Sequence, residues 1–184
     1  MNGLAVALKE WAVVCEALAA GRQAVVLRKG GIAEAGGAFR VEHDRFWLYP
    51  TYVHQQQAGV VEEARPLLER AERTRPAEGV VRLTHFAEVR AVRYVEDLGE
   101  VLRLAPLHVW SRETVEARFR YRTPGLFVLA VRAYRAAEAH ELAETAAYAG
   151  CKSWVDLGGE LDVTGEAVLG DAAFTAVLGQ MGGG

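Results

Sequence analysis

Hydrophobic residues near the N-terminus recur at alternating spacings of four and three residues. Such spacing places side chains on one face of a helix, so it predicts an N-terminal amphipathic helix. Gly21 follows this segment and supplies a natural C-terminal stop. A strand over 11–17 is the alternative, because Val13 and Val14 are β-branched and tolerate an extended backbone. The residues that define the helical face are Leu4, Leu8, Trp11, Cys15 and Leu18.

Five later stretches have the composition or the alternation of strands. The first is continuously apolar and predicts a strand that is buried on both faces. The second, either one strand or two short ones, ends at Pro50, which lacks a donor for the sheet and so favours an edge or a turn. The third alternates and is rich in valine, which predicts a long strand. The stretches are 23–27, 39–49, 80–95, 119–122 and 126–134.

Helices are predicted between these strands. Residues 54–73 have helical spacing, and Pro66 within them predicts either a kink or the first turn of a shorter helix. Asp97 is expected to cap a helix that runs to Leu104, and Ser111 is expected to cap another.

The order of these elements predicts one α+β domain. Its sheet is expected to be mixed or antiparallel and partly closed, with about five strands and flanking helices. At 184 residues, 51% of them apolar, the chain is long enough for one domain with a substantial core. We expect residues 1–135 to form this core and 136–184 to form an acidic extension packed on it. Within the extension, 136–149 should be helical or loosely ordered, 171–178 should form a last short helix, and the final residues should be disordered.

Charge is distributed unevenly along the chain. The formal net charge of −3 and the pI of about 6.0 argue against a protein that works by broad attraction to nucleic acid or to an anionic membrane. Seven arginines fall between 103 and 135, whereas eight acidic residues and one cation, Lys152, follow position 135. The acidic tail would either fold over the basic segment or repel other anions from it, and solvated charged faces are the simpler interpretation.

Other features of the chain exclude whole classes of protein. No stretch approaches the ~20 apolar residues of a membrane helix, and the N-terminus lacks the pattern of a secretory signal, so we expect a cytoplasmic protein with no membrane partner. Cys15 and Cys151 have no paired spacing, which suits reduced, buried thiols. No motif for a metal or a cofactor is present, and we expect none.

One strand end combines charge with glycine. Arg28 and Lys29 follow the apolar run and precede Gly30 and Gly31. Two glycines let backbone amides approach a phosphate while the two cations neutralise it, so this segment is a candidate anion site. The spacing matches neither a P-loop nor a dinucleotide fingerprint, and a charged strand end followed by a turn is the alternative.

Two histidines and a carboxylate lie close together in the sequence. Glu42, His43 and His54 suggest acid–base or metal chemistry, because imidazole titrates near neutrality. Glu42 and His43 are adjacent, however, and adjacent side chains of a strand point to opposite faces. Structural histidines that are hydrogen-bonded near aromatic rings are the alternative.

Aromatic rings are concentrated between positions 46 and 52. Trp47, Tyr49 and Tyr52 lie near Arg45, and stacking of unpaired bases on such rings is worth ~1 to 3 kcal/mol each. Rings at alternating positions of a strand are more often part of the core, so burial of at least one pair is the alternative.

Several segments together resemble a bacterial family catalogued as domain of unknown function 1802. The resemblance covers nearly the whole chain, but the family has no established activity, so it assigns no functional residue. The segments are 7–13, 27–32, 42–43, 48–52, 54–55 and 150–157.

A second resemblance concerns the fold alone. The order of helix, Gly21–Arg22, buried strand and Arg28 is similar to the ASCH branch of the PUA-like, RNA-associated barrels. In those domains a glycine and a cation precede a strand that ends in charged residues facing the cleft. Val26 stands where that pattern has a glutamate. This resemblance implies a fold, which is weak evidence for a function.

These observations favour a module that binds single-stranded nucleic acid or another phosphate-bearing ligand. A small hydrolase that uses Glu42, His43 and His54 is the first alternative, and a structural or partner-binding protein is the second. The predicted binding residues are Arg22, Arg28, Lys29, Gly30, Gly31, Arg45, Trp47, Tyr49 and Tyr52.

Overall fold

The computed structural model describes residues 3–29, 41–53, 57–150 and 152–182, and these contain seven strands and five α-helices. The strands are β1 (Gly3–Trp11), β2 (Val25–Arg28), β3 (Arg45–Thr51), β4 (Val80–Val95), β5 (Leu126–Ala143), β6 (Trp154–Asp162) and β7 (Gly165–Ala167). The helices are α1 (Ala12–Ala19), α2 (Arg65–Arg73), α3 (Leu98–Arg103), α4 (Arg112–Arg120) and α5 (Asp171–Gly182).

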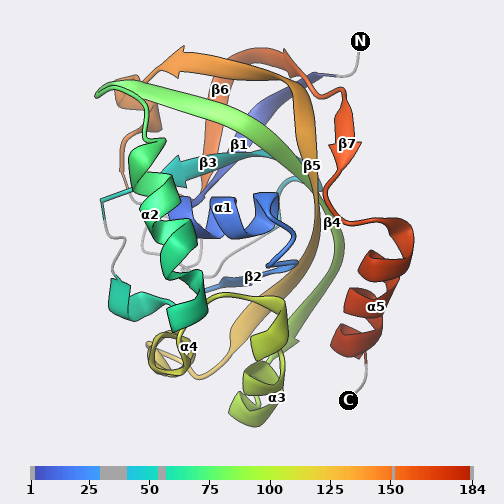
Figure 1. Cartoon of the computed structure of the whole chain (residues 1–184). Helices are drawn as coiled ribbons and strands as arrows, with labels where there is room; N and C mark the ends of the chain where they lie inside the picture. Colours follow the sequence, from blue (N-terminus) through green and yellow to red (C-terminus); the bar gives the residue numbers. More distant parts are fainter. Residues whose placement is uncertain (1–2, 30–40, 54–56, 151, 183–184) are drawn as a thin grey trace.

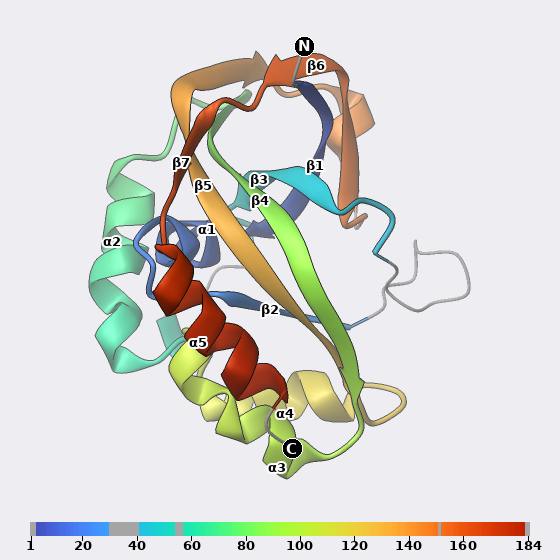
Figure 2. The same ribbon diagram turned by 90° about the vertical axis from the view of Figure 1, so that its right-hand side faces the viewer.

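All seven strands belong to one mixed, curved sheet. Its order is β2-β5-β4-β3-β1-β6, and β7 pairs with β5 outside this path. Only β1 and β3 run parallel among the described strands. Figures 1 and 2 show the long strands β4 and β5 crossing the molecule, with α1 beside α2 and with α5 lying along β5. The predicted α+β class with a mixed, partly closed sheet is confirmed, but the sheet has seven strands rather than about five.

The N-terminus departs from the predicted helix. Residues 3–11 form β1, which pairs with β3 on one side and with β6 on the other, and the helix begins only at Ala12. The four-residue spacing of Leu4 and Leu8 would place both on the same face of a regular strand. The register shift between Leu4 and Val6 changes this, and the two leucines pack against different hydrophobic clusters of the core. Tertiary pairing with two distant strands therefore overrides the local helical pattern. Gly21 ends the helical segment as expected, with φ of +67°.

The second departure lies in the C-terminal half. Residues 136–143 continue β5 instead of forming a helix, because 140–143 pair with the first residues of β4, from Val80 to Leu83, and Ala136 pairs with Gly165 of β7. The predicted strand at 119–122 is wrong as well, since these residues end α4 and begin a turn. The division of the chain at residue 135 stays a prediction, and β5 runs through that position.

The predicted helix caps and the predicted bounds of β4 are confirmed. β4 has the predicted bounds, and the Asp97 carboxylate accepts a hydrogen bond from the Glu100 amide at 2.7 Å. The Ser111 hydroxyl likewise accepts from the Thr114 amide. Pro66 lies in the first turn of α2, so the helix predicted from position 54 begins at Arg65.

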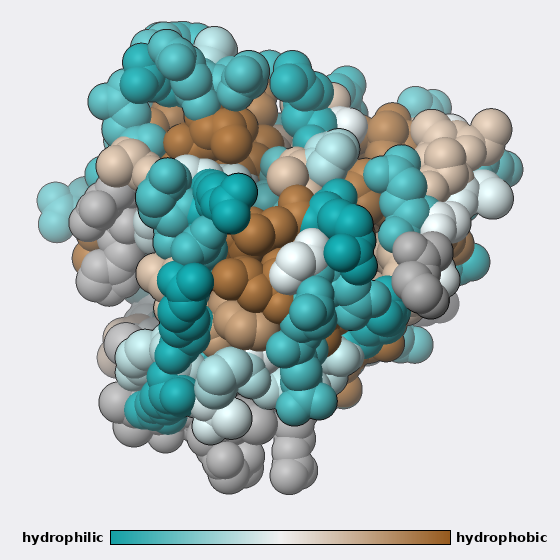
Figure 3. Space-filling model, turned by 90° about the horizontal axis from the view of Figure 1, so that it is seen from below, coloured by the Kyte–Doolittle hydropathy of each residue, from teal (hydrophilic) through white to brown (hydrophobic). Residues whose placement is uncertain are grey.

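Two hydrophobic clusters form the core. The larger one packs α1, α3, α4 and α5 against the sheet, and the smaller one gathers around Trp47 and Phe86. Seen from below (Figure 3), hydrophobic side chains occupy the middle of the visible face and hydrophilic side chains border them. Among the described helices, none has both the length and the apolar composition needed to cross a membrane.

Candidate ligand-binding site

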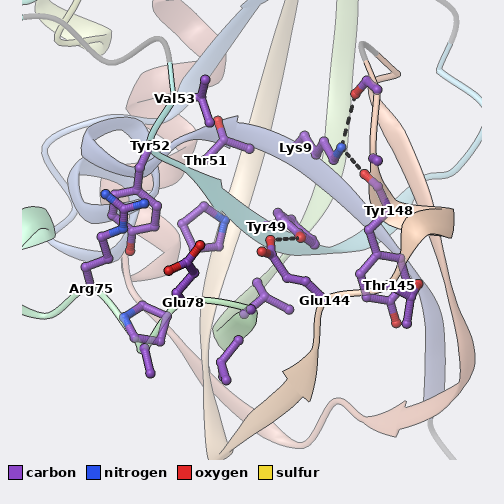
Figure 4. Close-up of a pocket in the computed structure, with 18 of the residues that line it drawn as sticks. Lys9, Tyr49, Thr51, Tyr52, Val53, Arg75, Glu78, Glu144, Thr145 and Tyr148 are labelled. Carbon is purple, nitrogen blue, oxygen red and sulfur yellow. Dashed lines mark hydrogen bonds between the residues drawn. The ribbon is translucent and has the colours of Figure 1, made fainter.

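A pocket of about 610 Å³ opens between β3, the turn before β4 and the segment that follows β5. We call it the tyrosine pocket, because Tyr49, Tyr52 and Tyr148 line it (Figure 4). Its volume lies in the range typical of sites for small molecules and cofactors. The charged residues of its lining are Lys9, Arg75, Lys152, Glu78 and Glu144.

The inner wall of this pocket is held by hydrogen bonds between distant segments. The Tyr49 hydroxyl donates to Glu144 Oε1 at 2.5 Å, and Lys9 Nζ donates to the carbonyls of Tyr148 and Gly150 (Figure 4). Burial, reinforced by Glu144, raises the pKa of Tyr49, so the phenol stays protonated and keeps its role as donor. Tyr49 is 3% exposed and therefore forms the floor of the pocket rather than a free stacking surface.

Tyr52 and Arg75 form a stacked pair in the pocket wall. The Arg75 guanidinium lies over the Tyr52 ring at 4.7 Å from its centroid. Burial, with a smaller contribution from Cys15, raises the pKa of Tyr52 to about 12. Arg75 and Lys152 form no ion pair with another described residue, so both cations remain available to an anion.

Arg28 is engaged with the end of β1 and with β6. Its Nη1 donates to Glu10 Oε1 at 2.7 Å and to the Lys9 carbonyl at 3.2 Å, and its Nη2 donates to the Ser153 hydroxyl. The side chains of Arg28 and Glu10 are only 15% and 3% exposed. The guanidinium thus compensates a carboxylate that is almost fully buried.

Lys29 closes the end of α4. Its Nζ donates to the carbonyls of Phe119, Thr123 and Gly125. A cation at a helix C-terminus stabilises carbonyls that lack partners within the helix. Gly30 and Gly31 lie outside the described residues, so an anion site at this strand end stays a prediction.

Three other predicted binding residues lie apart from the tyrosine pocket. Arg22 is exposed beyond α1, and Arg45 pairs with Glu88 at 3.2 Å. Trp47 is fully buried, and its ring packs edge-on against Phe86. Of the aromatic residues proposed to stack bases, only Tyr52 offers a ring that is not fully enclosed.

The residues predicted for hydrolysis do not form a described cluster. Glu42 and His43 are exposed just before β3, where the His43 ring contacts Trp154 at 5.2 Å between centroids. His54 lies outside the described residues, so the hydrolase alternative stays a prediction. No group of three or more metal-ligating side chains occurs in the ranges that the structure describes.

Comparison with family models identifies the chain. The model described as Domain of unknown function (DUF1802) matches residues 7–180. The chain belongs to this family. Comparison with curated proteins gives no match.

Three crystal structures of ASCH from Zymomonas mobilis are similar to this DUF1802 protein. One is the structure of ASCH itself, with 16% identity, 69% of this chain and 66% of that chain covered, and a TM-score of 0.41. A variant of the same protein gives 17% identity, the same coverage and a TM-score of 0.42. Another variant gives 11% identity over 95% of this chain and 96% of that chain, with a TM-score of 0.46. The chain thus spans about two thirds of the length of the first two matches.

The sequence did not reveal several residues of the DUF1802 protein that contribute to the aromatic and charged contacts described above. Arg118 stacks over Trp110 at 3.8 Å from the ring centroid, and Trp110 packs edge-on against Trp11. Glu144 and Arg75 belong to no recognisable motif. Glu144 contacts Tyr49 and Arg75 contacts Tyr52 only because the fold brings these segments together. For Tyr49 and Glu144, 95 residues separate the two partners. No signal in the local sequence would have found these pairs.

Proposed function

We propose that this protein binds a nucleotide unit, free or within single-stranded nucleic acid, in the tyrosine pocket. The observation that carries this proposal is the combination of one stacked cation–aromatic pair, Tyr52 and Arg75, with a further unpaired cation, Lys152, in a single pocket of about 610 Å³.

Each part of the pocket suits one part of such a ligand. A base stacks on aromatic rings and on the planar guanidinium of arginine, so it would extend the Tyr52–Arg75 pair. A phosphate would be neutralised by Lys152 and by the edge of Arg75. The Glu144 carboxylate and the Thr51 hydroxyl supply acceptors for amino or hydroxyl groups of the ligand.

Fluorescence anisotropy with labelled single-stranded RNA and DNA at low salt tests the proposal, with AMP as an unlabelled competitor. Tyr52→Leu removes the stacking ring and should weaken binding by about 5-fold to 150-fold, which corresponds to ~1 to 3 kcal/mol per base. Lys152→Met should reduce the slope of log K against log salt by about 0.7, as expected for one lost contact to a single-stranded phosphate.

Arg103→Met serves as the matched control. This exposed arginine at the end of α3 does not line the pocket and takes part in no described ion pair. It should bind as the unmodified protein does. Absence of saturable binding to all three probes would remove the proposal. Wild-type affinity in both Tyr52→Leu and Arg75→Met would show that binding occurs elsewhere.

A further inference from the structure

A second cavity of about 600 Å³ lies beside the tyrosine pocket and shares Pro50, Tyr52 and Pro76 with it. We call it the arginine cavity. Three guanidinium groups and one carboxylate belong to its lining, so the lining itself carries an excess of positive charge. The charged residues are Arg70 from α2, Arg82 from β4, Arg135 from β5 and Glu16 from α1.

The three arginines differ in how they are compensated. Arg70 pairs with Glu16 at 3.1 Å, and Arg82 pairs at 2.6 Å with Glu141, which is not part of the lining. Arg135 is exposed to solvent and forms no ion pair with any described residue, although Glu166 of β7 lies opposite it in the strand register. Arg135 therefore brings a full positive charge that a ligand can reach.

His85 responds to this positive charge. It lies opposite Arg135 in the register of β4 and β5, and its Nδ1 is 2.9 Å from the Thr84 hydroxyl. Its Nε2 is buried without a hydrogen-bond partner among the described residues. Burial first, and then the charges of Arg135 and Arg70, lower the pKa of His85 to about 4. The imidazole is thus neutral near pH 7 and adds no charge to the cavity.

Six alanines make part of the remaining wall small and apolar, and Thr74 and Thr84 add hydroxyl groups to it. The cavity is much larger than an inorganic anion, and side chains of one methyl group leave room for the body of an organic molecule. The alanines that line it are Ala12, Ala19, Ala20, Ala136, Ala137 and Ala139.

We infer that the arginine cavity is a second ligand site, which takes a small organic molecule with a dianionic head group, a phosphomonoester or a dicarboxylate. Arg135 holds the head group, because the planar fork of a guanidinium matches both carboxylate and phosphate oxygens. Arg70 and Arg82 add to the attraction, and the alanine wall contacts the body. This site uses other cations than the tyrosine pocket, so it does not depend on the function proposed for that pocket.

Calorimetric titration near neutral pH with phenyl phosphate and, separately, with phthalate tests the inference. We expect saturable binding of at least one probe, and the probe that binds identifies the head group. Arg135→Met should weaken it about tenfold or more, as expected for a lost hydrogen bond between charged groups. Arg103→Met should leave it unchanged. Arg70→Met provides a second variant, expected to weaken binding as well, in case the Arg135 substitution disturbs β5.

The His85 imidazole gives an independent readout by NMR. Without ligand it should remain neutral as the pH falls from about 8 to about 5, whereas with phenyl phosphate it should begin to titrate in this range, because the anion offsets the arginine charges. In Arg135→Met the pKa of His85 should rise without ligand, and its response to phenyl phosphate should require at least about tenfold more probe. Absence of saturable binding of both probes at millimolar concentration, or equal affinity in Arg135→Met, would overturn the inference.

Discussion

Replacing Arg28 by methionine removes the guanidinium that faces the buried Glu10 carboxylate. Three hydrogen bonds disappear with it, to Glu10, to the Lys9 carbonyl and to Ser153. Among the described residues, Glu10 would keep only the Trp11 amide as a donor, at 3.3 Å, and its side chain is 3% exposed in the structure. The substitution therefore leaves a buried carboxylate without its ion-pair partner, and Arg118 is then the cation that still interacts with it.

The expected loss is large for a single substitution. Breaking a buried ion pair by removing one partner costs about 3 to 5 kcal/mol of unfolding free energy. For a chain of this length, 1 kcal/mol corresponds to about 2 to 4 °C, so the melting temperature should fall by about 6 to 20 °C.

Chemical denaturation and calorimetry of Arg28→Met measure this loss, and Arg103→Met is the control. The control should stay within about 0.5 kcal/mol of the unmodified protein, because Arg103 is exposed and has no described ion pair. Adding Glu10→Gln to Arg28→Met should restore part of the stability, since the buried charge is then removed as well. An Arg28→Met protein that melts at the original temperature would refute the structural role of this arginine.

Three further predictions concern other described contacts. Lys29→Met should lower the unfolding free energy by about 1.5 to 3 kcal/mol, measured by urea denaturation, because three carbonyls lose a charged donor, whereas Lys152→Met should not. Burial lowers the pKa of His85 and of His108 to about 4, below the unfolded value of about 6.5, so the stability that they contribute is present above pH ~6.5 and is lost as the pH falls toward 4. Urea midpoints across this range should fall with pH, and less steeply in His85→Gln. Tyr52 should ionise near pH 12 in an ultraviolet titration, and Tyr52→Phe should remove that late step, whereas an ionisation near pH 10 would contradict its burial.

Part of the fold is predictable from short-range patterns in the sequence, such as helix caps and the alternation of apolar and polar residues. The caps at Asp97 and Ser111 and the bounds of β4 were correct, because capping and alternation depend on neighbouring residues. The local spacing predicts a helix for the residues of β1. Their strand conformation depends on pairing with Trp47 to Thr51 and with β6, and the local sequence does not show these distant partners. The extension of β5 beyond position 135 was missed for the same reason.

The candidate site was predictable only in its aromatic part. Tyr49 and Tyr52 were identified from their concentration in one segment, and both line the tyrosine pocket. Their partners, Glu144 and Arg75, come from other segments, so spacing along the chain could not reveal them. The charges of Arg28 and Lys29 were recognised, but their hydrogen-bond partners lie 18 to 125 residues away and depend on the fold.

The most direct test of the proposed site is the mapping of backbone amide chemical shifts during titration with a short single-stranded RNA. The largest and saturable changes should occur around Tyr52, Arg75 and Lys152, the residues that combine a ring with unpaired charge in one pocket. Changes confined to the Arg28–Lys29 strand end, or no saturable change anywhere, would contradict the account.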